Sequence, residues 1–337
     1  MVEILGAVSI ALIVWFGGGQ VIQGALTFGS LVAFIQYSER FFYPIRDLSE
    51  KYNILQQAMA SSERIFKLLD EKPDITDPQE PVKVESVKGE LRFENLWFAY
   101  HDNDWVLKEI DLKVQAGERI AVVGATGAGK TSLISLLLRF YEYQVGDIKL
   151  DGVSIRDLPV KEYRSNFALV LQDIFVFSGS IARNVRMGNE KIRDDDIGRV
   201  LGTVGADRFV NRLDGGIDYH LAERGSNLSV GQRQLLAFAR ALAFDPRILI
   251  LDEATSSVDT ETEIMIQDAL EKLLAARTSI IIAHRLSTIK NSDRIVVLHK
   301  GTIKEMGSHA ELLELGGIYH RLYQLQYKDQ EIPARVA

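Results

Sequence analysis

The sequence predicts an α/β protein with a largely parallel sheet, preceded by an all-α membrane region. Three observations predict this fold class. Residues 4–38 contain no Asp, Glu, Lys, Arg or His, and about 20 such residues already span the hydrocarbon of a bilayer. Further along, continuous apolar runs alternate with amphipathic stretches, as buried parallel strands and crossover helices do. A glycine-rich loop at 124–131 stands where one such strand gives way to a helix.

The composition is that of an ordinary globular protein of about two domains. The 337 residues are 47% hydrophobic and 25% charged, as is usual for folded proteins. The 46 acidic residues outnumber the 39 basic ones and give a net charge of −7, which argues against a broad basic surface for nucleic acid. The absence of cysteine excludes disulfides, thiolate metal sites and a cysteine nucleophile.

The uncharged N-terminal run predicts two membrane helices. Glycines at 17–19, then at 24 and 29, predict a break into two helices, the first centred on 4–16. Thr27 is the expected N-cap of the second helix. Apolar residues at steps of three or four continue that helix to Leu69, which corresponds to roughly 65 Å, about twice the thickness of the bilayer core.

The charges after the uncharged run predict its orientation. Arg40, Arg46 and Lys51 place the end of the second helix, and the chain that follows, in the cytoplasm. A signal peptide is the alternative, but Glu3 stands where such peptides are positively charged, and no small-residue cleavage pattern follows. Two helices cannot enclose a solute pathway, so we expect either a fragment or a dependence on partner subunits.

A proline-containing segment at 71–87 separates these helices from the second domain. Pro73, Pro78 and Pro81 stand there among acidic and small residues, which predicts a linker. Strands are predicted at 91–100, 110–114, 120–123, 248–251, 279–283 and 295–298, and an amphipathic helix at 261–276.

The loop after the strand at 120–123 carries the pattern G-x-x-x-x-G-K-[ST] at 124–131. Its glycines permit a tight turn whose amides point inward, and the dipole of the following helix adds positive potential. Lys130 is expected to reach the terminal phosphates of a nucleotide, and Thr131 to ligate magnesium. The residues predicted to bind the nucleotide here are Gly124, Thr126, Gly127, Ala128, Gly129, Lys130, Thr131 and Ser132.

Two further apolar runs end in residues that suit phosphate chemistry. The run at 248–251 leads into Asp252 and Glu253, at the strand end where open α/β sheets bind ligands. Asp252 is predicted to hold magnesium, and Glu253 to polarise the water that attacks the γ-phosphate. His284 follows the run at 279–283, and its imidazole is predicted to hold Glu253 and this water in line.

A third motif, Leu-Ser-Val-Gly-Gln at 228–232, opens a helical stretch that extends to Ala243. It resembles the signature motif of ABC (ATP-binding cassette) proteins. Ser229 and the amides near Gly231 would form an anion site at a helix N-terminus. The resemblance implies that Ser229, Gly231 and Gln232 face an ATP bound to a second subunit, so that two chains sandwich two nucleotides.

The resemblance covers essentially the whole chain and assigns further residues. Tyr100 matches the aromatic residue that stacks on adenine, Gln172 the Q-loop and Asp259 the D-loop beside the nucleotide. The segment 223–225 matches the loop before the signature in exporters. The resemblance thus implies Lys130, Gln172, Glu253 and His284 as catalytic residues, and Thr131, Gln172 and Asp252 as metal ligands.

This sequence departs from the family pattern in three respects. Val230 stands where glycine is more common, which should be tolerated because the amides and Ser229 make the contact. Ser257 and Val258 replace a frequent Ala-Leu, and nothing in the sequence assigns a consequence. The family's plan of six membrane helices implies that about four are absent here.

The resemblance implies a P-loop ABC ATPase domain with a β-subdomain and an α-helical signature subdomain, after a partial all-α transmembrane region. The expected boundaries are a transmembrane part at 1–70, a linker at 71–88, the nucleotide-binding domain at 89–328 and a tail at 329–337.

The predicted function is that of an exporter half-transporter of the multidrug or lipid type, with ATP and Mg²⁺ as cofactors. It would couple ATP hydrolysis between two cassettes, in a homodimer or heterodimer, to transport of a lipid or hydrophobic drug-like substrate. It would be a multi-pass protein of the cell (inner) membrane, with its ATPase domain in the cytoplasm and no nucleic acid partner. The alternative is a nucleotide-binding regulatory or assembly module without transport. A DNA-repair ATPase would need long coiled coils and no apolar N-terminus.

Overall fold

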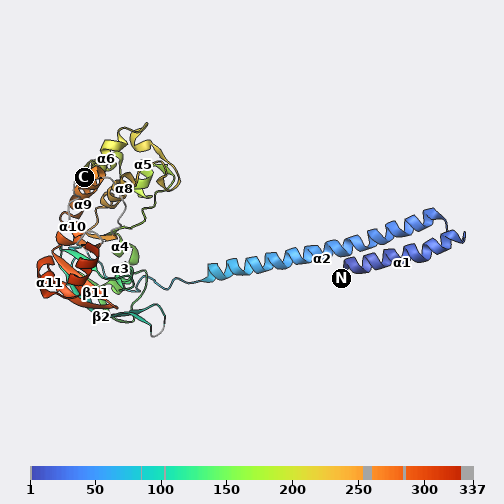
Figure 1. The fold of residues 1–337 in the computed structure, drawn as a ribbon, viewed down its shortest axis with the longest axis horizontal. Coiled ribbons are helices and arrows are strands. Elements are labelled where there is room, and N and C mark those ends of the chain that lie inside the picture. Colours follow the sequence, from blue (N-terminus) through green and yellow to red (C-terminus); the bar gives the residue numbers. More distant parts are fainter. Residues whose placement is uncertain (1, 85, 102–103, 253–259, 284–285, 328–337) are drawn as a thin grey trace. The chain divides into compact units, whose positions relative to one another are not determined.

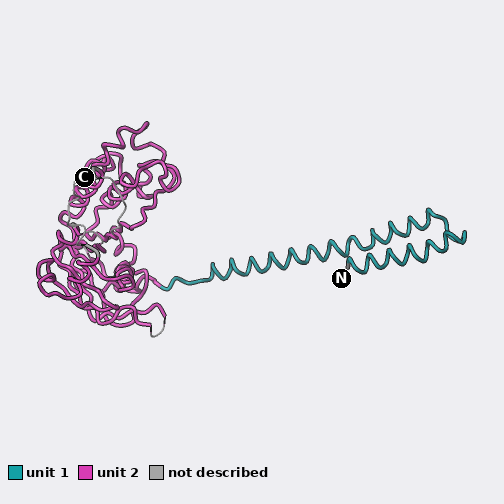
Figure 2. The backbone as a smooth tube through the Cα atoms, viewed as in Figure 1, with its two compact units in different colours: residues 1–74 teal, residues 75–337 magenta. Residues whose placement is uncertain are grey.

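The fold of the chain consists of two units. The computed structural model describes residues 2–84, 86–101, 104–252, 260–283 and 286–327. The first unit comprises residues 1–74 and the second residues 75–337 (Figure 2). The described part of the first unit is helical, and the second is a mixed α/β domain, so the predicted fold class is confirmed.

The first unit is a helical hairpin. Helices α1 (Val2–Ile22) and α2 (Phe28–Asp70) lie side by side (Figure 1). Thr27 is the N-cap of α2, and its Oγ1 accepts a hydrogen bond from the amide of Ser30 at 3.2 Å. The predicted N-cap is therefore confirmed.

The predicted break into two helices is confirmed, but it falls at Gly24 and not at the glycines of 17–19. Helix α1 continues through these glycines, and the chain turns at 23–27, where Gly24 has a φ of 76°. Gly17 instead faces α2, because a Cβ at this position would lie 2.5 Å from Cδ1 of Leu31. Small residues let two helices approach closely, so Gly17 serves the contact between the helices, whereas Gly18 and Gly19 have nothing within 4 Å.

Among the described residues, α1 is the helix whose length and composition suit a membrane span, over residues 3–22. The uncharged part of α2 ends at Ser38 and is followed by Glu39 and Arg40. A second membrane helix therefore stays a prediction.

The strands of the second unit are β1 (Leu91–Ala99), β2 (Trp105–Val114), β3 (Arg119–Val123), β4 (Val145–Leu150), β5 (Val153–Ser154), β6 (Phe167–Val170), β7 (Gly179–Ser180), β8 (His220–Leu221), β9 (Ile248–Asp252), β10 (Thr278–Ile282), β11 (Arg294–His299) and β12 (Thr302–Gly307). One sheet has the order β12-β11-β3-β10-β9-β6 and is parallel except for β12. A second, antiparallel sheet has the order β2-β1-β4-β5, and β7 pairs with β8.

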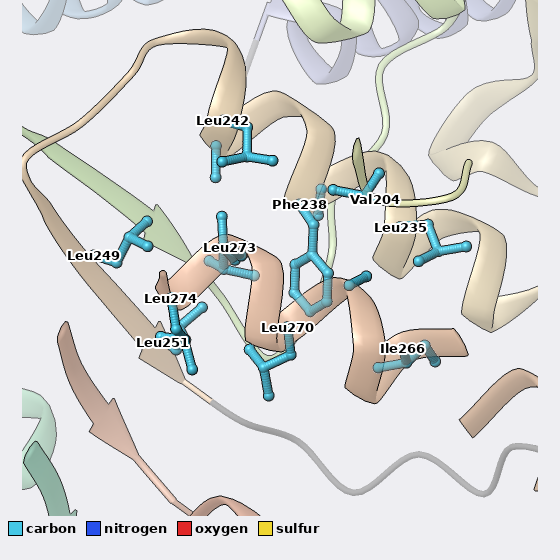
Figure 3. Close-up of a cluster of buried hydrophobic side chains, with 14 of the residues drawn as sticks. Val204, Leu235, Phe238, Leu242, Leu249, Leu251, Ile266, Leu270, Leu273 and Leu274 are labelled. Atoms are coloured by element: carbon cyan, nitrogen blue, oxygen red, sulfur yellow. The ribbon is translucent and has the colours of Figure 1, made fainter. Parts of the chain in front are cut away.

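The helices of this unit are α3 (Lys130–Leu137), α4 (Val160–Arg164), α5 (Ile181–Arg186), α6 (Asp194–Thr203), α7 (Asp207–Val210), α8 (Val230–Ala243), α9 (Thr260–Leu274), α10 (Leu286–Lys290), α11 (His309–Leu315) and α12 (Ile318–Leu322), with single helical turns at 155–157, 216–218, 223–225 and 323–327. Figure 3 shows Phe238 of α8 against Leu270 and Leu273 of α9. This core also includes Leu249 and Leu251 of β9, so it joins α8 to the parallel sheet.

Part of the predicted linker is fixed to the second unit. A guanidinium nitrogen of Arg139 donates to the carbonyl of Thr76 at 3.3 Å, and the amide of Val160 donates to Oδ1 of Asp77 at 2.7 Å. The amide of Val82 also donates to a carbonyl of this domain, at 2.9 Å. The segment from Thr76 to Val82 is thus bound to the surface of the second unit.

Candidate nucleotide-binding site

The loop between β3 and α3 passes very close to its neighbours. A Cβ at Gly124 would lie 2.3 Å from the carbonyl oxygen of Leu298, and one at Gly129 would lie 2.6 Å from Cδ2 of Leu107. Gly127 and Gly129 have φ values of 79° and 104°, in the region that glycine adopts without strain. The path of the backbone itself therefore requires glycines in this pattern.

Lys130 begins α3 and turns its ammonium group back over the loop. Its Nζ donates to the carbonyl oxygens of Gly124 at 2.7 Å and Ala125 at 3.1 Å. Burial lowers the pKa of Lys130, and the negative charge of Asp252 partly opposes this shift. A half-buried cation is screened less by water than an exposed one, so it would interact more strongly with an anion in the loop.

The remaining predicted loop residues differ in exposure. Thr126 and Gly127 are exposed at the tip of the loop, as is Thr131 in the first turn of α3. Ala128 and Ser132 are buried. A ligand can therefore reach the tip and the hydroxyl of Thr131 directly.

The register of the parallel sheet brings predicted site residues to one edge. Val122 of β3 pairs with Ile282 of β10, which pairs in turn with Asp252 of β9. Strand β9 also pairs with β6, which ends at Val170, two residues before Gln172. Because these strands are parallel, the loop after β3, Asp252 and Gln172 all follow the same edge of the sheet.

A cavity of about 340 Å³ connects this edge with the start of α8. Asp252 and Gln172 line it from the sheet, and Val230, Arg233 and Gln234 line it from α8. Residues three and four apart lie on one face of a helix. Val230, Arg233 and Gln234 therefore share one face of α8, and this face is directed toward the sheet edge.

Ser229 caps α8 but does not line that cavity. Its Oγ accepts a hydrogen bond from the amide of Gln232 at 3.2 Å, and Oε1 of Gln232 accepts one from the amide of Ser229 at 2.9 Å. This is a capping box. Gly231 packs on α9, because a Cβ there would lie 2.1 Å from Cγ2 of Thr262. Gln232 and Gly231 thus act within the fold, whereas exposed Ser229 keeps its hydroxyl hydrogen for another acceptor.

The sequence pattern did not single out Arg233. Its Nη1 donates to the carbonyls of Leu228 at 2.7 Å and Gly225 at 3.3 Å. This side chain ties the loop at 223–225 to the signature helix and also lines the cavity. Arg233 stands three residues after Val230 of the signature motif and thus on the same face of the helix. This spacing is the signal that could have identified it.

Tyr100 lies beside the first turn of the phosphate-loop helix. Its hydroxyl donates to Oγ of Ser132 at 3.1 Å. The side chain is 42% exposed, so part of its ring is open to a ligand.

Three predicted site residues, Glu253, Asp259 and His284, lie outside the described residues. Within the described ranges, no three His, Cys, Asp or Glu side chains gather as a metal cluster. The oxygens of Asp252 and Thr131 are a sparse donor set, which fits a Mg²⁺ ion that takes its other ligands from phosphates and water.

Three features together define the ATP-binding domain of ABC proteins. They are a phosphate loop after β3, an acidic residue at the end of β9, and the capped helix α8, which follows the short helices α5 to α7. Residues 107–256 match the family model of ABC transporters, and the chain belongs to that family. The domain is accordingly an ATPase domain of the ABC type.

Similar proteins carry membrane and ATP-binding parts together. A probable multidrug resistance ABC transporter ATP-binding/permease protein of Bacillus subtilis is 44% identical over 97% of this chain and 48% of its own length. An ATP-dependent lipid A-core flippase of Desulfotalea psychrophila is 43% identical over 97% of this chain and 57% of its own. The chain spans about half the length of the curated relatives it matches.

A solved structure shares the fold as well. The structure of a bacterial Atm1-family ABC exporter with ATP bound has a TM-score of 0.74 and 34% sequence identity. The match covers 99% of this chain and 57% of the exporter chain.

Proposed function

We propose that the chain is the ATP-hydrolysing part of an ABC exporter half-transporter that moves a lipid or another hydrophobic small molecule. The observation that carries this proposal is the shared sheet edge, where the loop after β3, Asp252 and Gln172 meet. The relatives named as multidrug, lipid and fatty acid transporters support the substrate class.

Each site residue has a role in this proposal. The amides of 124–131 and Lys130 bind the phosphates of ATP, and the face of Tyr100 stacks on adenine. Thr131, Asp252 and Gln172 would hold Mg²⁺, which neutralises phosphate charge when it is bound. Glu253 polarises the attacking water, and His284 holds that water in line.

A second half-transporter, identical or related, completes the site. Ser229 is exposed at the N-terminus of the 14-residue helix α8, where the helix dipole favours an anion. We assign Ser229 to the nucleotide bound by the partner, with Gly231 and Gln232 holding the start of its helix in place, and we assign Asp259 of the D-loop to the same nucleotide. ATP would close the two cassettes, and hydrolysis would let them separate.

The first unit belongs in the cell membrane and the second in the cytoplasm. The apolar helix α1 supports the membrane assignment. Arg40, Arg46 and Lys51 on α2 support the orientation, because such charges favour the cytoplasmic side.

The experiment compares ATP turnover with ATP binding for the purified chain in detergent. Glu253→Gln should abolish steady-state hydrolysis and leave ATP binding intact, whereas Lys130→Ala should weaken binding itself. Gln115→Ala is the matched control, because Gln115 is exposed in the turn between β2 and β3, at the end of β3 opposite the phosphate loop. Equal turnover in wild type and Glu253→Gln would remove Glu253 from the role of base, and binding without any turnover would favour the regulatory module.

A further inference from the structure

The ring of Tyr100 is held from several sides. Phe98 meets it edge to face with ring centroids 4.7 Å apart, and Tyr141 does so at 4.9 Å. The hydroxyl is held by Ser132 at 3.1 Å. Phe98 is buried, whereas Tyr100 and Tyr141 are 42% and 47% exposed. The ring therefore has a defined orientation and still keeps an open surface.

Gln144 holds the backbone from which Tyr100 projects. Its Oε1 accepts a hydrogen bond from the amide of Ala99 at 3.0 Å, and its Nε2 donates to the carbonyl of Ala99 at 3.0 Å. Strand β4 begins at Val145, which pairs with Trp97 of β1. The side-chain amide of Gln144 thus continues the ladder beyond the end of the strand, up to the residue before Tyr100.

Tyr141 and Gln144 belong to one short segment that follows α3. Arg139, which begins this segment and is 5% exposed, donates to Oε1 of Glu142 at 2.8 Å and to the carbonyl of Ile155 at 3.1 Å. The opposite end of α3 carries the phosphate loop. A firmly anchored segment therefore connects the support of the Tyr100 ring to the helix that binds phosphate.

We propose that Tyr141 and Gln144 are positioning residues that hold the Tyr100 ring in the orientation in which it stacks on the base of the nucleotide. This proposal rests on the proposed ATP-binding function. A ring that is already ordered loses less side-chain entropy when a ligand binds, so the same stacking contact contributes more to affinity. The ring contacts of Tyr141 and the side-chain hydrogen bonds of Gln144 given above are made with residues 98–100 and not with the phosphate loop, so we expect their effect to depend on the base.

The test compares MgATP with magnesium tripolyphosphate, which has phosphates but no base. Affinities for the full chain in detergent are measured by titration calorimetry. Tyr141→Leu and Gln144→Ala should each weaken ATP binding about 3- to 10-fold, given the usual strength of aromatic pairs and the cost of ordering a side chain. Tripolyphosphate affinity should stay within about twofold, because the phosphate loop is unchanged.

Three controls accompany these variants. Tyr100→Ala sets the full effect of losing the stacking ring. Tyr141→Phe keeps the ring, so its ratio of affinities for MgATP and magnesium tripolyphosphate should equal that of wild type. Gln115→Ala removes an exposed glutamine of the same domain and should change neither affinity.

The possible outcomes separate the proposals. Equal weakening of both ligands, at an unchanged melting temperature, would mean a general effect on the phosphate loop and would overturn the inference. Unchanged ATP affinity in both variants would overturn it too. Failure of the wild type to bind either ligand would instead refute the proposed function. If Tyr141→Leu does not fold, exposed Gln144 still provides the test through Gln144→Ala.

Discussion

The two units of the chain differ sharply in how they bury apolar side chains. Among the described side chains of residues 3–74, Leu31 is the one large apolar group that is buried, while Trp15 is 80% and Leu48 is 70% exposed. In the second unit, every residue of Thr278–Ile282 is buried. The second unit thus has hydrophobic cores of its own.

The first unit needs an apolar environment from elsewhere. Burial of apolar area contributes about 25 cal/mol per Å², and contiguous exposed patches of this kind mark contacts with membrane or protein. The comparison teaches that the ATPase domain buries apolar cores of its own, whereas the hairpin leaves most of its apolar side chains for lipid or further helices.

The same substitution in both units should give the largest contrast. Leu273→Ala removes a fully buried side chain of α9 and should lower the free energy of unfolding by about 2–5 kcal/mol. Leu48→Ala on α2 should change it by less than about 0.5 kcal/mol. Denaturant unfolding of the chain in detergent measures both, and equal costs would contradict the comparison.

Alanine in place of glycine should give the next largest contrast. Gly124→Ala sets a methyl group 2.3 Å from a backbone carbonyl, so we expect a loss of about 1–3 kcal/mol and of ATP binding. Gly18 has nothing within 4 Å, and Gly18→Ala should raise the helicity of α1 slightly, because alanine favours helix by about 1 kcal/mol. Calorimetry and circular dichroism check these outcomes, and wild-type ATP affinity in Gly124→Ala would argue against the close approach.

Loss of a helix cap should have a smaller effect, global in the second unit and local in the first. Ser229→Ala should destabilise the second unit by about 1 kcal/mol, because it removes the side-chain cap of α8. Thr27→Ala should act only locally, as faster hydrogen exchange at the amide of Ser30. A global shift of unfolding in Thr27→Ala would show that the units are thermodynamically coupled.

The smallest effect concerns alkaline pH. Burial and the hydrogen bond to Asp147 raise the pKa of Tyr143 from 10.0 to about 12. The neutral phenol therefore contributes stability that is fully present below pH 10 and is lost as pH rises through about 12. Between these two pH values the free energy of unfolding of wild type should fall by about 1 kcal/mol more than that of Tyr143→Phe. This is less than the energy that corresponds to the whole pKa shift, because solvent screens the phenolate. Parallel pH profiles of melting temperature would refute this.

Some elements were predictable because a single local pattern defines them. The apolar runs at 248–251 and 279–283 became β9 and β10, since buried parallel strands are apolar on both faces. The amphipathic helix predicted at 261–276 is α9, at Thr260–Leu274. The predicted helix from near Thr27 to Leu69 is α2, whose last residue is Asp70.

Other elements had no local signal. Strands β4 and β12 were not predicted, because each is partly exposed and depends on pairing with β1 or β11. Strand β2 begins at Trp105 and not at the predicted residue 110. Pairing with β1 extends the strand to this earlier residue.

The sequence by itself determined the glycine pattern of the phosphate loop, the buried strands and the cap of α8, because each is recognised from residues within a few positions of one another. Only the tertiary structure decided that Gly231 packs on Thr262 and that Gln144 pairs with Ala99. These partners are far apart along the chain. Sheet register and helix packing bring these partners together, and no pattern of neighbouring residues predicts such a contact.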